Sequence, residues 1–267
     1  MTTLQAAVLG LVQGITEFLP ISSTAHLRLV PALLGWPDGG AAFAAVIQLG
    51  TLLAVIGFFL RDLLRMIAAA TRPATRKDLE ARMLLYIVAG TVPIGVAGLL
   101  ARHAVEGPLR SILVIASSLI VVGIVMAIVE KTARHERPLE SFTLRDALIV
   151  GLAQTLALVP GTSRSGITLV AAMILGFRRD AAARFSFLLS IPAVAAAGVF
   201  ELPKLLHDHE VGATALVTGL LVAAVSGYLS VAWLIRFLRT RTTYVFVIYR
   251  VILGLGLIVA VLSHTFR

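Results

Sequence analysis

The chain of 267 residues contains no cysteine, and only 14% of its residues are charged. Without cysteine, the protein has no disulfide bond, no thiolate nucleophile and no thiolate metal ligand. The low content of charge accompanies a hydrophobic fraction of 58% and a mean hydropathy of +0.96, values that exclude a soluble domain with an ordinary polar surface. The composition therefore indicates an integral membrane protein.

Long apolar runs dominate the sequence, and they lack the alternation of a membrane β-barrel strand. Several approach the roughly 20 residues that cross a bilayer as a helix. The predicted fold class is an all-α polytopic membrane protein with about six spanning helices. The expected spans are 41–60, 83–100, 111–129, 182–202, 213–235 and 244–262.

Two further pairs of apolar runs are each interrupted by a proline. The runs 4–19 and 21–34 flank Pro20, and a second pair at 144–159 and 163–175 flanks Pro160. Each run is short for a bilayer crossing, and irregular backbone at membrane depth persists only where protein or a wet cavity surrounds it. We therefore predict two re-entrant helix hairpins with the prolines near their tips.

The two hairpins have related sequences, GLVQGITEFLPISSTAH at 10–26 and GLAQTLALVPGTSRSG at 151–166. Glu17 and His26 occur only in the first copy. Arg164 occurs only in the second, where it faces Thr24. We expect one membrane domain, 1–267, whose repeat halves at about 1–130 and 144–267 are joined by a cytoplasmic loop and specialised around one shared site. The aligned pairs are Gly10 with Gly151, Leu11 with Leu152, Gln13 with Gln154 and, after a one-residue slip, Pro20 with Pro160, Ser22 with Thr162 and Ser23 with Ser163.

Basic residues gather in four of the breaks between apolar runs, which is typical of cytoplasmic connections. Six spans and two hairpins that do not cross fit this pattern only if both termini face outward. The first hairpin then enters from outside and the second from inside, so the repeat is inverted, as in many transporters. The four basic breaks lie within 61–82, 131–145, 178–184 and 236–241.

The formal net charge of +9 is interpreted as a topology signal. The basic residues do not form one amphipathic face, so the lipid bilayer is the expected partner and nucleic acid is not. A face of small residues at 193–198 would support either a homodimer or packing within the chain.

Glu17 is the acidic residue that lies well inside an apolar segment, where a charge costs on the order of 3 kcal/mol. It follows Gln13 by four residues, so both side chains share one helical face, close to a cluster of hydroxyl groups. A structural carboxylate bound to a neighbouring helix is the alternative. The surroundings favour a functional acid.

Hydroxyl side chains follow both prolines, where new helices are expected to begin. Such residues usually cap the helix N-terminus. Two helix starts that meet across a pseudo-twofold axis would also direct free N–H groups and positive dipole ends at one point, which favours an anion such as phosphate. The predicted phosphate-binding residues are Ser22, Thr24, Gly161, Thr162, Ser163, Arg164, Ser165 and Gly166.

Three side chains add to this prediction. The planar guanidinium of Arg164 suits bidentate phosphate contact, although an arginine at this place can also snorkel to the interface. His26 lies one helical turn beyond Ser23 and could exchange a proton near neutral pH. Arg250 lies inside a span, where it could pair with Glu17 or snorkel; we expect a structural role.

The segments QGITEFLPISSTAH and PGTSRSG, with Tyr249 and Arg250, resemble the paired signatures of the bacterial undecaprenyl-diphosphate phosphatases, the bacitracin-resistance family. The resemblance covers the whole chain in length and span order. It implies hydrolysis of undecaprenyl diphosphate to undecaprenyl phosphate and inorganic phosphate in the bacterial plasma (inner) membrane, which recycles the lipid carrier for cell-wall polymers. By position, it implies catalytic roles for Glu17, for Ser23 as nucleophile and for His26, and phosphate binding at 163–165.

The resemblance also implies a divalent cation, Mg²⁺ or Ca²⁺. The chain departs from the family at Gln13, where a glutamate is often found. The expected metal ligands are therefore one carboxylate, Glu17, and the amide oxygen of Gln13, which can coordinate such a cation or hold a water.

We expect hydrolysis from the outer, periplasmic side, with Arg164 and the helix starts holding the diphosphate. Ser23 would attack the terminal phosphorus while Glu17 or His26 takes its proton, or these groups would activate water directly; both routes stay open. The alternative function is transport, as a lipid-phosphate flippase or a small-anion carrier, because inverted repeats and broken helices fit it equally well. A purely structural subunit leaves Glu17 and Arg164 unexplained.

Overall fold

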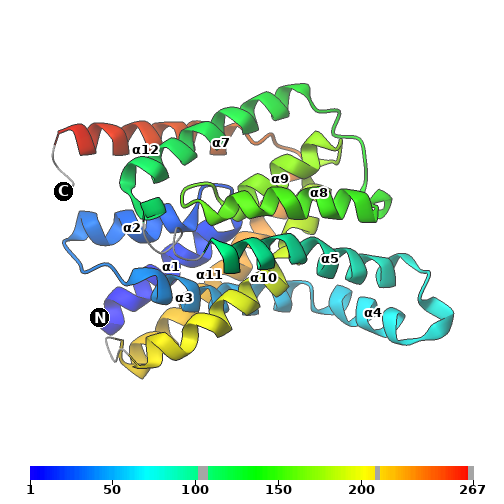
Figure 1. Cartoon of the computed structure of the whole chain (residues 1–267), viewed down its shortest axis with the longest axis horizontal. Coiled ribbons are helices and arrows are strands. Elements are labelled where there is room, and N and C mark those ends of the chain that lie inside the picture. Colours follow the sequence, from blue (N-terminus) through cyan, green and yellow to red (C-terminus); the bar gives the residue numbers. More distant parts are fainter. Residues whose placement is uncertain (102–107, 208–210, 264–267) are drawn as a thin grey trace.

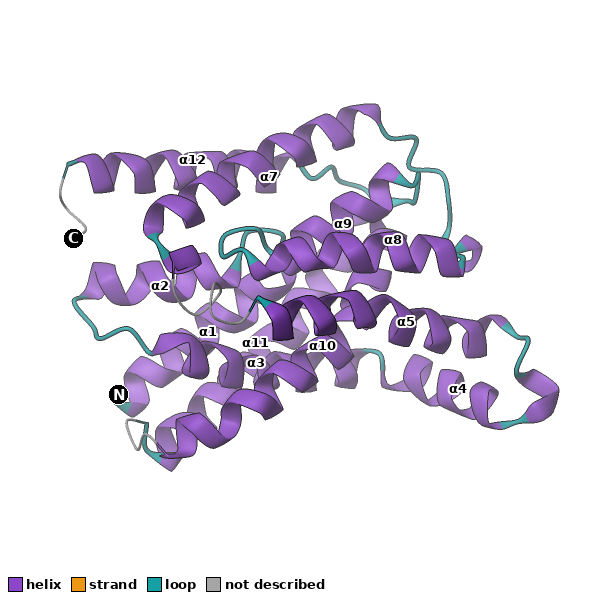
Figure 2. Cartoon of the chain, viewed as in Figure 1, coloured by secondary structure: helices purple, strands orange, loops and turns teal. Residues whose placement is uncertain are grey.

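The computed structural model describes residues 1–101, 108–207 and 211–263, which form helices joined by short connections (Figures 1 and 2). Within these ranges the only β-type pairing is an isolated bridge between Arg137 and Phe177. The chain is an all-α polytopic membrane protein, as its composition predicts. Five of the described helices are long and apolar enough to cross a bilayer: α5 (Leu79–Leu100), α7 (Ile112–Thr132), α10 (Arg179–His207), α11 (Ala213–Leu238) and α12 (Tyr244–Leu262).

The remaining predicted span is a bent helix pair. Helix α3 (Gly40–Phe58) meets α4 (Leu60–Thr71) at an angle of 73°, and the pair passes as one span. The first part of the expected basic connection 61–82 is helical. Arg61 and Arg65 interrupt the hydropathy, but leucine and methionine recur at helical spacing, so an amphipathic helix forms that buries Met66.

Both predicted hairpins form a helix, a turn that contains the proline, and a second helix. The first consists of α1 (Thr3–Phe18) and α2 (Ser23–Leu34), and the second of α8 (Leu144–Gln154), the 3₁₀ turn η4 (Thr155–Leu158) and α9 (Arg164–Ile174). Pro20 and Pro160 lie in the two turns, as predicted.

The second helix of each hairpin starts in the same unusual way. Ser22 and Ser163 are the N-caps of α2 and α9, with φ values of 75° and 68° and ψ values of 97° and 114°. The side-chain oxygen of each serine accepts a hydrogen bond from the backbone N–H three residues on, at Ala25 (3.4 Å) and Gly166 (3.1 Å). Positive φ is strained for serine, so its occurrence at both caps marks them as equivalent positions.

This equivalence corrects the sequence alignment of the two motifs. Ser22 corresponds to Ser163, and the one-residue slip that paired Ser22 with Thr162 is wrong. The slip followed the two prolines, whereas the caps fix where the helices begin. Without it, Arg164 corresponds to Ser23 rather than to Thr24, and both are the first residues of their helices.

Aligned glycines allow close helix packing in both halves. Helix α1 packs against α11, and α8 packs against α5. A β-carbon on Gly10 would lie 2.4 Å from the carbonyl oxygen of Gly219, and one on Gly151 would lie 2.1 Å from that of Gly90. Small residues at these crossings let the backbones touch, which is how helices associate in membranes.

The face of small residues at 193–198 packs within the chain in part. A β-carbon on Gly198 would lie 2.4 Å from a methyl carbon of Leu49 in α3, and Ala193 and Ala197 line an internal cavity described below. Gly198 therefore packs within the chain, whereas Ala196 and Ala197 are exposed, and a homodimer stays a prediction.

The ends of the helices divide between two ends of the molecule. The start of α1, the end of α12 and the α2–α3 connection lie at one end, and α4 and the α7–α8 connection lie at the other (Figure 1). This is the arrangement required if both termini face the same side of the membrane.

Candidate active site

The two hairpin turns border a cavity of about 150 Å³. Its polar side chains come from both hairpins and from α3, and its apolar ones come chiefly from α5, η4 and α10. The cavity therefore has a polar part, called the polar floor below, and an apolar part, called the apolar wall. This combination suits an amphipathic ligand. The polar residues are Glu17, Ser22, Ser23, Thr24, Gln48, Ser163 and Arg164, and the others are Ile94, Ala157, Val159, Gly161, Ala193, Val194 and Ala197.

An ion pair joins the two halves at the polar floor. Nη2 of Arg164 donates to Oε1 of Glu17, and both side chains are largely buried, with 15% and 5% exposed. Nη1 of Arg164 lies 3.5 Å from the carbonyl oxygen of Ser190 in α10. Glu17 thus has the partner that its burial requires, and that partner is Arg164; the alternative of pairing with Arg250 is wrong.

The other carboxylate oxygen of Glu17 accepts two hydrogen bonds within the first hairpin. Ser23 Oγ donates to Oε2 at 2.7 Å, and Gln13 Nε2 donates to the same atom at 2.7 Å. Ser23 is partly exposed, in the lining of the cavity. A serine hydroxyl that donates to a carboxylate and faces a cavity is positioned as a nucleophile with an adjacent base.

His26 lies in a different environment from the one expected. Its Nδ1 is 2.7 Å from the carbonyl oxygen of Ser22, which can only accept, so Nδ1 carries the proton. Its Nε2 therefore accepts from the hydroxyl of Tyr249 at 2.5 Å, and the two rings are stacked. His26 is not one of the described residues that line the cavity. The geometry therefore favours Glu17 as the group that takes the Ser23 proton.

Arg250 holds the two hairpin turns together, and the expected structural role is confirmed. Its side chain is fully buried. The guanidinium donates to carbonyl oxygens from both turns and from α7, namely those of Pro20 (3.0 Å), Gly161 (3.0 Å), Thr162 (3.0 Å), Leu119 (3.2 Å) and Ser118 (3.4 Å).

The predicted phosphate-binding residues divide into two groups. Ser22, Thr24, Gly161, Ser163 and Arg164 line the cavity. Thr162, Ser165 and Gly166 are buried and used elsewhere. The Thr162 carbonyl binds Arg250, Ser165 Oγ donates to the carbonyl oxygen of Leu19 (3.1 Å), and the N–H of Gly166 belongs to the cap of α9.

Gly161 has to be glycine for two reasons. Its φ is 92°, and a β-carbon there would lie 2.4 Å from the carbonyl oxygen of Ile115 in α7. The tight turn brings the start of α9 up to the cavity, where the first N–H groups of the helix have no intrahelical acceptor.

The sequence interpretation missed Gln48, which contributes a polar side chain to the cavity from α3. The available signal was an amide in the otherwise apolar stretch 43–59. The apolar wall was also missed, because alanine and valine at 193–197 read equally well as ordinary span residues.

Gln13 and Glu17 carry oxygen atoms of the kind that a divalent cation binds. Oε1 of Gln13 is buried and has no hydrogen-bond partner in the described part of the chain, which leaves a free oxygen beside Glu17. In the same part, no three His, Asp or Glu side chains cluster. Because Mg²⁺ is commonly held by one or two carboxylates together with substrate phosphates, one carboxylate is sufficient.

Comparison with known proteins identifies the family of this chain. The family model described as "Bacitracin resistance protein BacA" matches residues 6–256. The protein named "Undecaprenyl-diphosphatase" of Myxococcus xanthus is 53% identical over 264 residues, which cover 97% of this chain and 89% of the relative. "Undecaprenyl-diphosphatase 2" of Streptomyces coelicolor is 46% identical, over 98% and 95%, and "Undecaprenyl-diphosphatase" of Synechococcus elongatus is 47% identical, over 98% and 94%. The chain belongs to the bacitracin resistance protein BacA family.

Proposed function

We propose that this protein is an undecaprenyl-diphosphatase, which hydrolyses undecaprenyl diphosphate to undecaprenyl phosphate and inorganic phosphate. The observation that carries the proposal is the cluster of Ser23, Glu17 and Arg164 in a cavity with one apolar wall. The names of the relatives support the same substrate. The product is the carrier lipid of cell-wall synthesis, and its recycling is the cellular role we propose.

Substrate binding uses both sides of the cavity. Arg164 has five N–H donors, of which one is used by Glu17 and another points at Ser190, so the remainder can bind phosphate oxygens. The N–H groups that start α2 and α9 add donors and a positive dipole end. The apolar wall at 193–197 contacts the first isoprene units of the lipid.

The chemical step begins at Ser23. Its Oγ attacks the terminal phosphorus, its proton passes to Oε2 of Glu17, and the bond from that phosphorus to the bridging oxygen breaks, which releases undecaprenyl phosphate. Protonated Glu17 gives this proton to the departing undecaprenyl phosphate and is ionised again. It then takes a proton from water, which attacks the phosphoserine, and returns that proton to the Ser23 oxygen as this oxygen leaves and inorganic phosphate is released. Arg164 stabilises the charge on the transferring group throughout.

Gln13 and Glu17 are the residues that we propose to hold a divalent cation together with the substrate. When bound, Mg²⁺ or Ca²⁺ would offset the negative charge of the diphosphate. Glu17 would hold the cation with a carboxylate that also binds Ser23 and Arg164.

We propose that the protein lies in the bacterial plasma (inner) membrane and that its cavity opens to the periplasmic side. The four basic connections support this orientation, since they would be cytoplasmic.

Hydrolysis in detergent tests the proposal. Purified protein with Mg²⁺ is mixed with undecaprenyl diphosphate, and both products are quantified. A detergent micelle has no leaflets, so equal amounts of phosphate and undecaprenyl phosphate can only come from catalysis. Folded protein that releases neither product under any cation would overturn the proposal and leave transport of a lipid phosphate or a small anion as the function to test.

A further inference from the structure

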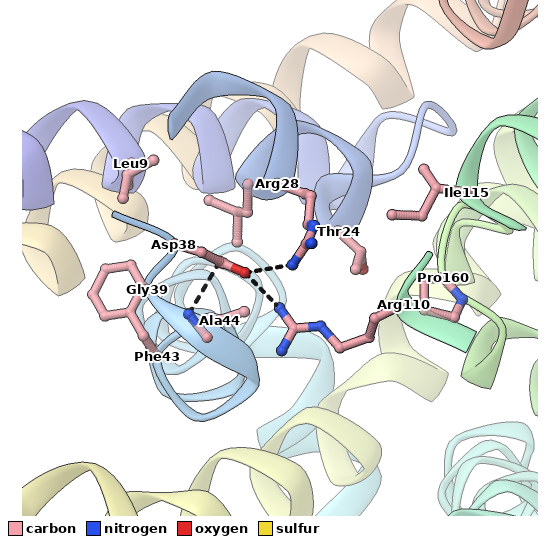
Figure 3. A pocket seen from close by; sticks show the side chains of 12 residues that line it. Leu9, Thr24, Arg28, Asp38, Gly39, Phe43, Ala44, Arg110, Ile115 and Pro160 are labelled. Carbon is pink, nitrogen blue, oxygen red and sulfur yellow. Dashed lines mark hydrogen bonds and ion pairs between the residues drawn. The ribbon is translucent and has the colours of Figure 1, made fainter. Parts of the chain in front are cut away.

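A second cationic group lies next to the catalytic cavity. Asp38, in the α2–α3 connection, accepts hydrogen bonds at Oδ2 from Arg28 Nη1 (2.6 Å) and from Arg110 Nη2 (3.3 Å), as Figure 3 shows. Arg28 belongs to α2, and Arg110 ends the short 3₁₀ turn η2 (Pro108–Arg110). Two positive charges therefore share one negative charge, and the group carries a net charge of about +1.

This group adjoins the catalytic cavity through Thr24. Thr24 lines both the cavity and the small pocket that contains the two arginines, and Pro160 of the pocket precedes Gly161 of the cavity. Arg28 follows Thr24 by four residues on α2, so the two share one face of the helix. Long helical side chains lean toward the helix N-terminus, and the Arg28 guanidinium lies on the side of Thr24 (Figure 3).

Within the described residues, most of the hydrogen-bonding capacity of these arginines is unused. Each guanidinium has five N–H donors, and among the described residues Asp38 is the acceptor for each. The side chains are also accessible, with 38% of Arg28, 23% of Arg110 and 40% of Asp38 exposed. A doubly charged phosphate would accept more of these donors than a single carboxylate oxygen does.

Asp38 occupies the space that such an anion needs. The pocket has a volume of about 20 Å³, which is room for about one water molecule. A phosphate group can reach both guanidiniums only by replacing the carboxylate, and exposed ion pairs are weak enough to exchange. Asp38 is then a resident counter-ion.

We propose that Arg28 and Arg110 form a second phosphate-binding site at the mouth of the catalytic cavity, where a phosphate group replaces the Asp38 carboxylate. The inference rests on the proposed function, because it concerns the path of substrate or product. The group lies at the end of the molecule where α1 starts, the end that the basic residues predict to be periplasmic (Figure 1). The phosphate that binds is either the headgroup of the lipid diphosphate or the released inorganic phosphate.

The test compares Arg28→Gln and Arg110→Gln with Asp38→Asn. If the site binds phosphate, each arginine variant raises KM for the lipid diphosphate or the inhibition constant for inorganic phosphate about tenfold, the loss expected for one charge-assisted hydrogen bond. Asp38→Asn shifts the same constant about threefold in the opposite direction, because it removes a competing ion pair. The asparagine keeps the oxygen that accepts from the Gly40 N–H, so the connection retains that contact.

A change in KM identifies the lipid headgroup as the ligand, and a change in the phosphate inhibition constant identifies the free product. Arg241→Gln, which removes an exposed charge from the α11–α12 connection, is the matched control and is expected to leave both constants unchanged. Stability in detergent is measured for every variant, so that a loss of folding is recognised.

A purely structural ion-pair cluster predicts a different outcome. It would make all three variants shift in the same direction, and that result would overturn the inference, as would unchanged constants in both arginine variants. Failure of the proposed function is distinguishable, because wild type would then release no phosphate at all. In that case the site is tested by thermal unfolding with added inorganic phosphate. The rise in melting temperature is compared between the single variant Arg164→Ala and the double variant Arg164→Ala with Arg28→Gln. Equal rises would overturn the inference.

Discussion

Arg164 of the second hairpin is ion-paired with Glu17 of the first, so the two halves of the chain meet in a single charge pair at the floor of the cavity. At the aligned position in the other half of the chain, neither residue is matched by a charged residue. Ser23 hydrogen-bonds to the same carboxylate from the first residue of α2, the position that Arg164 occupies in α9. The duplication thus supplies two similar helix starts, of which one holds the hydroxyl and the other the guanidinium.

Replacing Arg164 by alanine is expected to lower kcat by about 10²- to 10³-fold, since it removes a donor to the developing charge. The same change leaves Glu17 buried without its ion partner. The double variant Glu17→Gln with Arg164→Ala should therefore lose little more activity than either single variant, because the two residues act as a unit. Rates of phosphate release in detergent test this expectation, and fully multiplicative losses would contradict it.

Ser23→Ala is expected to lower activity by more than about 10³-fold, because it removes the nucleophile. Direct attack by water would cost only about tenfold, the value of one lost hydrogen bond. Acid quenching during turnover, followed by mass spectrometry of the peptide with Ser23, should find phosphoserine in wild type. A variant that retains a tenth of the activity would contradict the covalent route.

Gln13→Glu is expected to lower the Mg²⁺ concentration for half-maximal activity by about tenfold, because a second carboxylate replaces an amide oxygen at the cation. The wild-type enzyme should lose activity to a chelator and recover it with added Mg²⁺. Activity that persists in metal-stripped protein would count against the proposed cation. An unchanged Mg²⁺ requirement in the variant would count against Gln13 as a ligand.

Arg250→Met is expected to destabilise the protein by on the order of 3 kcal/mol, because it leaves buried carbonyl oxygens of both hairpin turns without a donor. Thermal unfolding in detergent measures the loss. Arg241→Met, at an exposed position, serves as the control and should leave the melting temperature unchanged. A fully stable Arg250→Met variant would contradict the account of how the two turns are joined.

Much of the fold follows from local sequence patterns. The long apolar runs predict their helices directly, and the prolines at 20 and 160 locate both turns, because proline ends a helix. Helix α4 was missed because Arg61 and Arg65 lower the hydropathy of a segment whose helical signal is its amphipathic spacing. The alignment slip arose because the backbone conformation of Ser22 and Ser163 has no signal in a single sequence.

The sequence predicts which residues form the candidate site, but it does not predict which of them pair with one another. Burial cost alone singles out Glu17 and Arg164, and a buried charge needs a partner. Which charges pair depends on contacts between residues 147 positions apart, and no local pattern encodes them. The hydrogen bond from Tyr249 to His26 also joins residues that are far apart in the sequence. The sequence shows only a histidine near a serine, whereas in the fold the ring of His26 faces Tyr249 of α12.

Phosphate release by Glu17→Gln tests the central claim most directly. Purified wild type, Glu17→Gln and the control Asp78→Asn, which removes an exposed carboxylate, are assayed in detergent with undecaprenyl diphosphate and Mg²⁺. The glutamine keeps the size of the side chain but cannot take the Ser23 proton, so we expect a loss of at least about 10²-fold in kcat in that variant alone. A well-folded Glu17→Gln protein with the activity of wild type would contradict the assignment of this cavity as the active site.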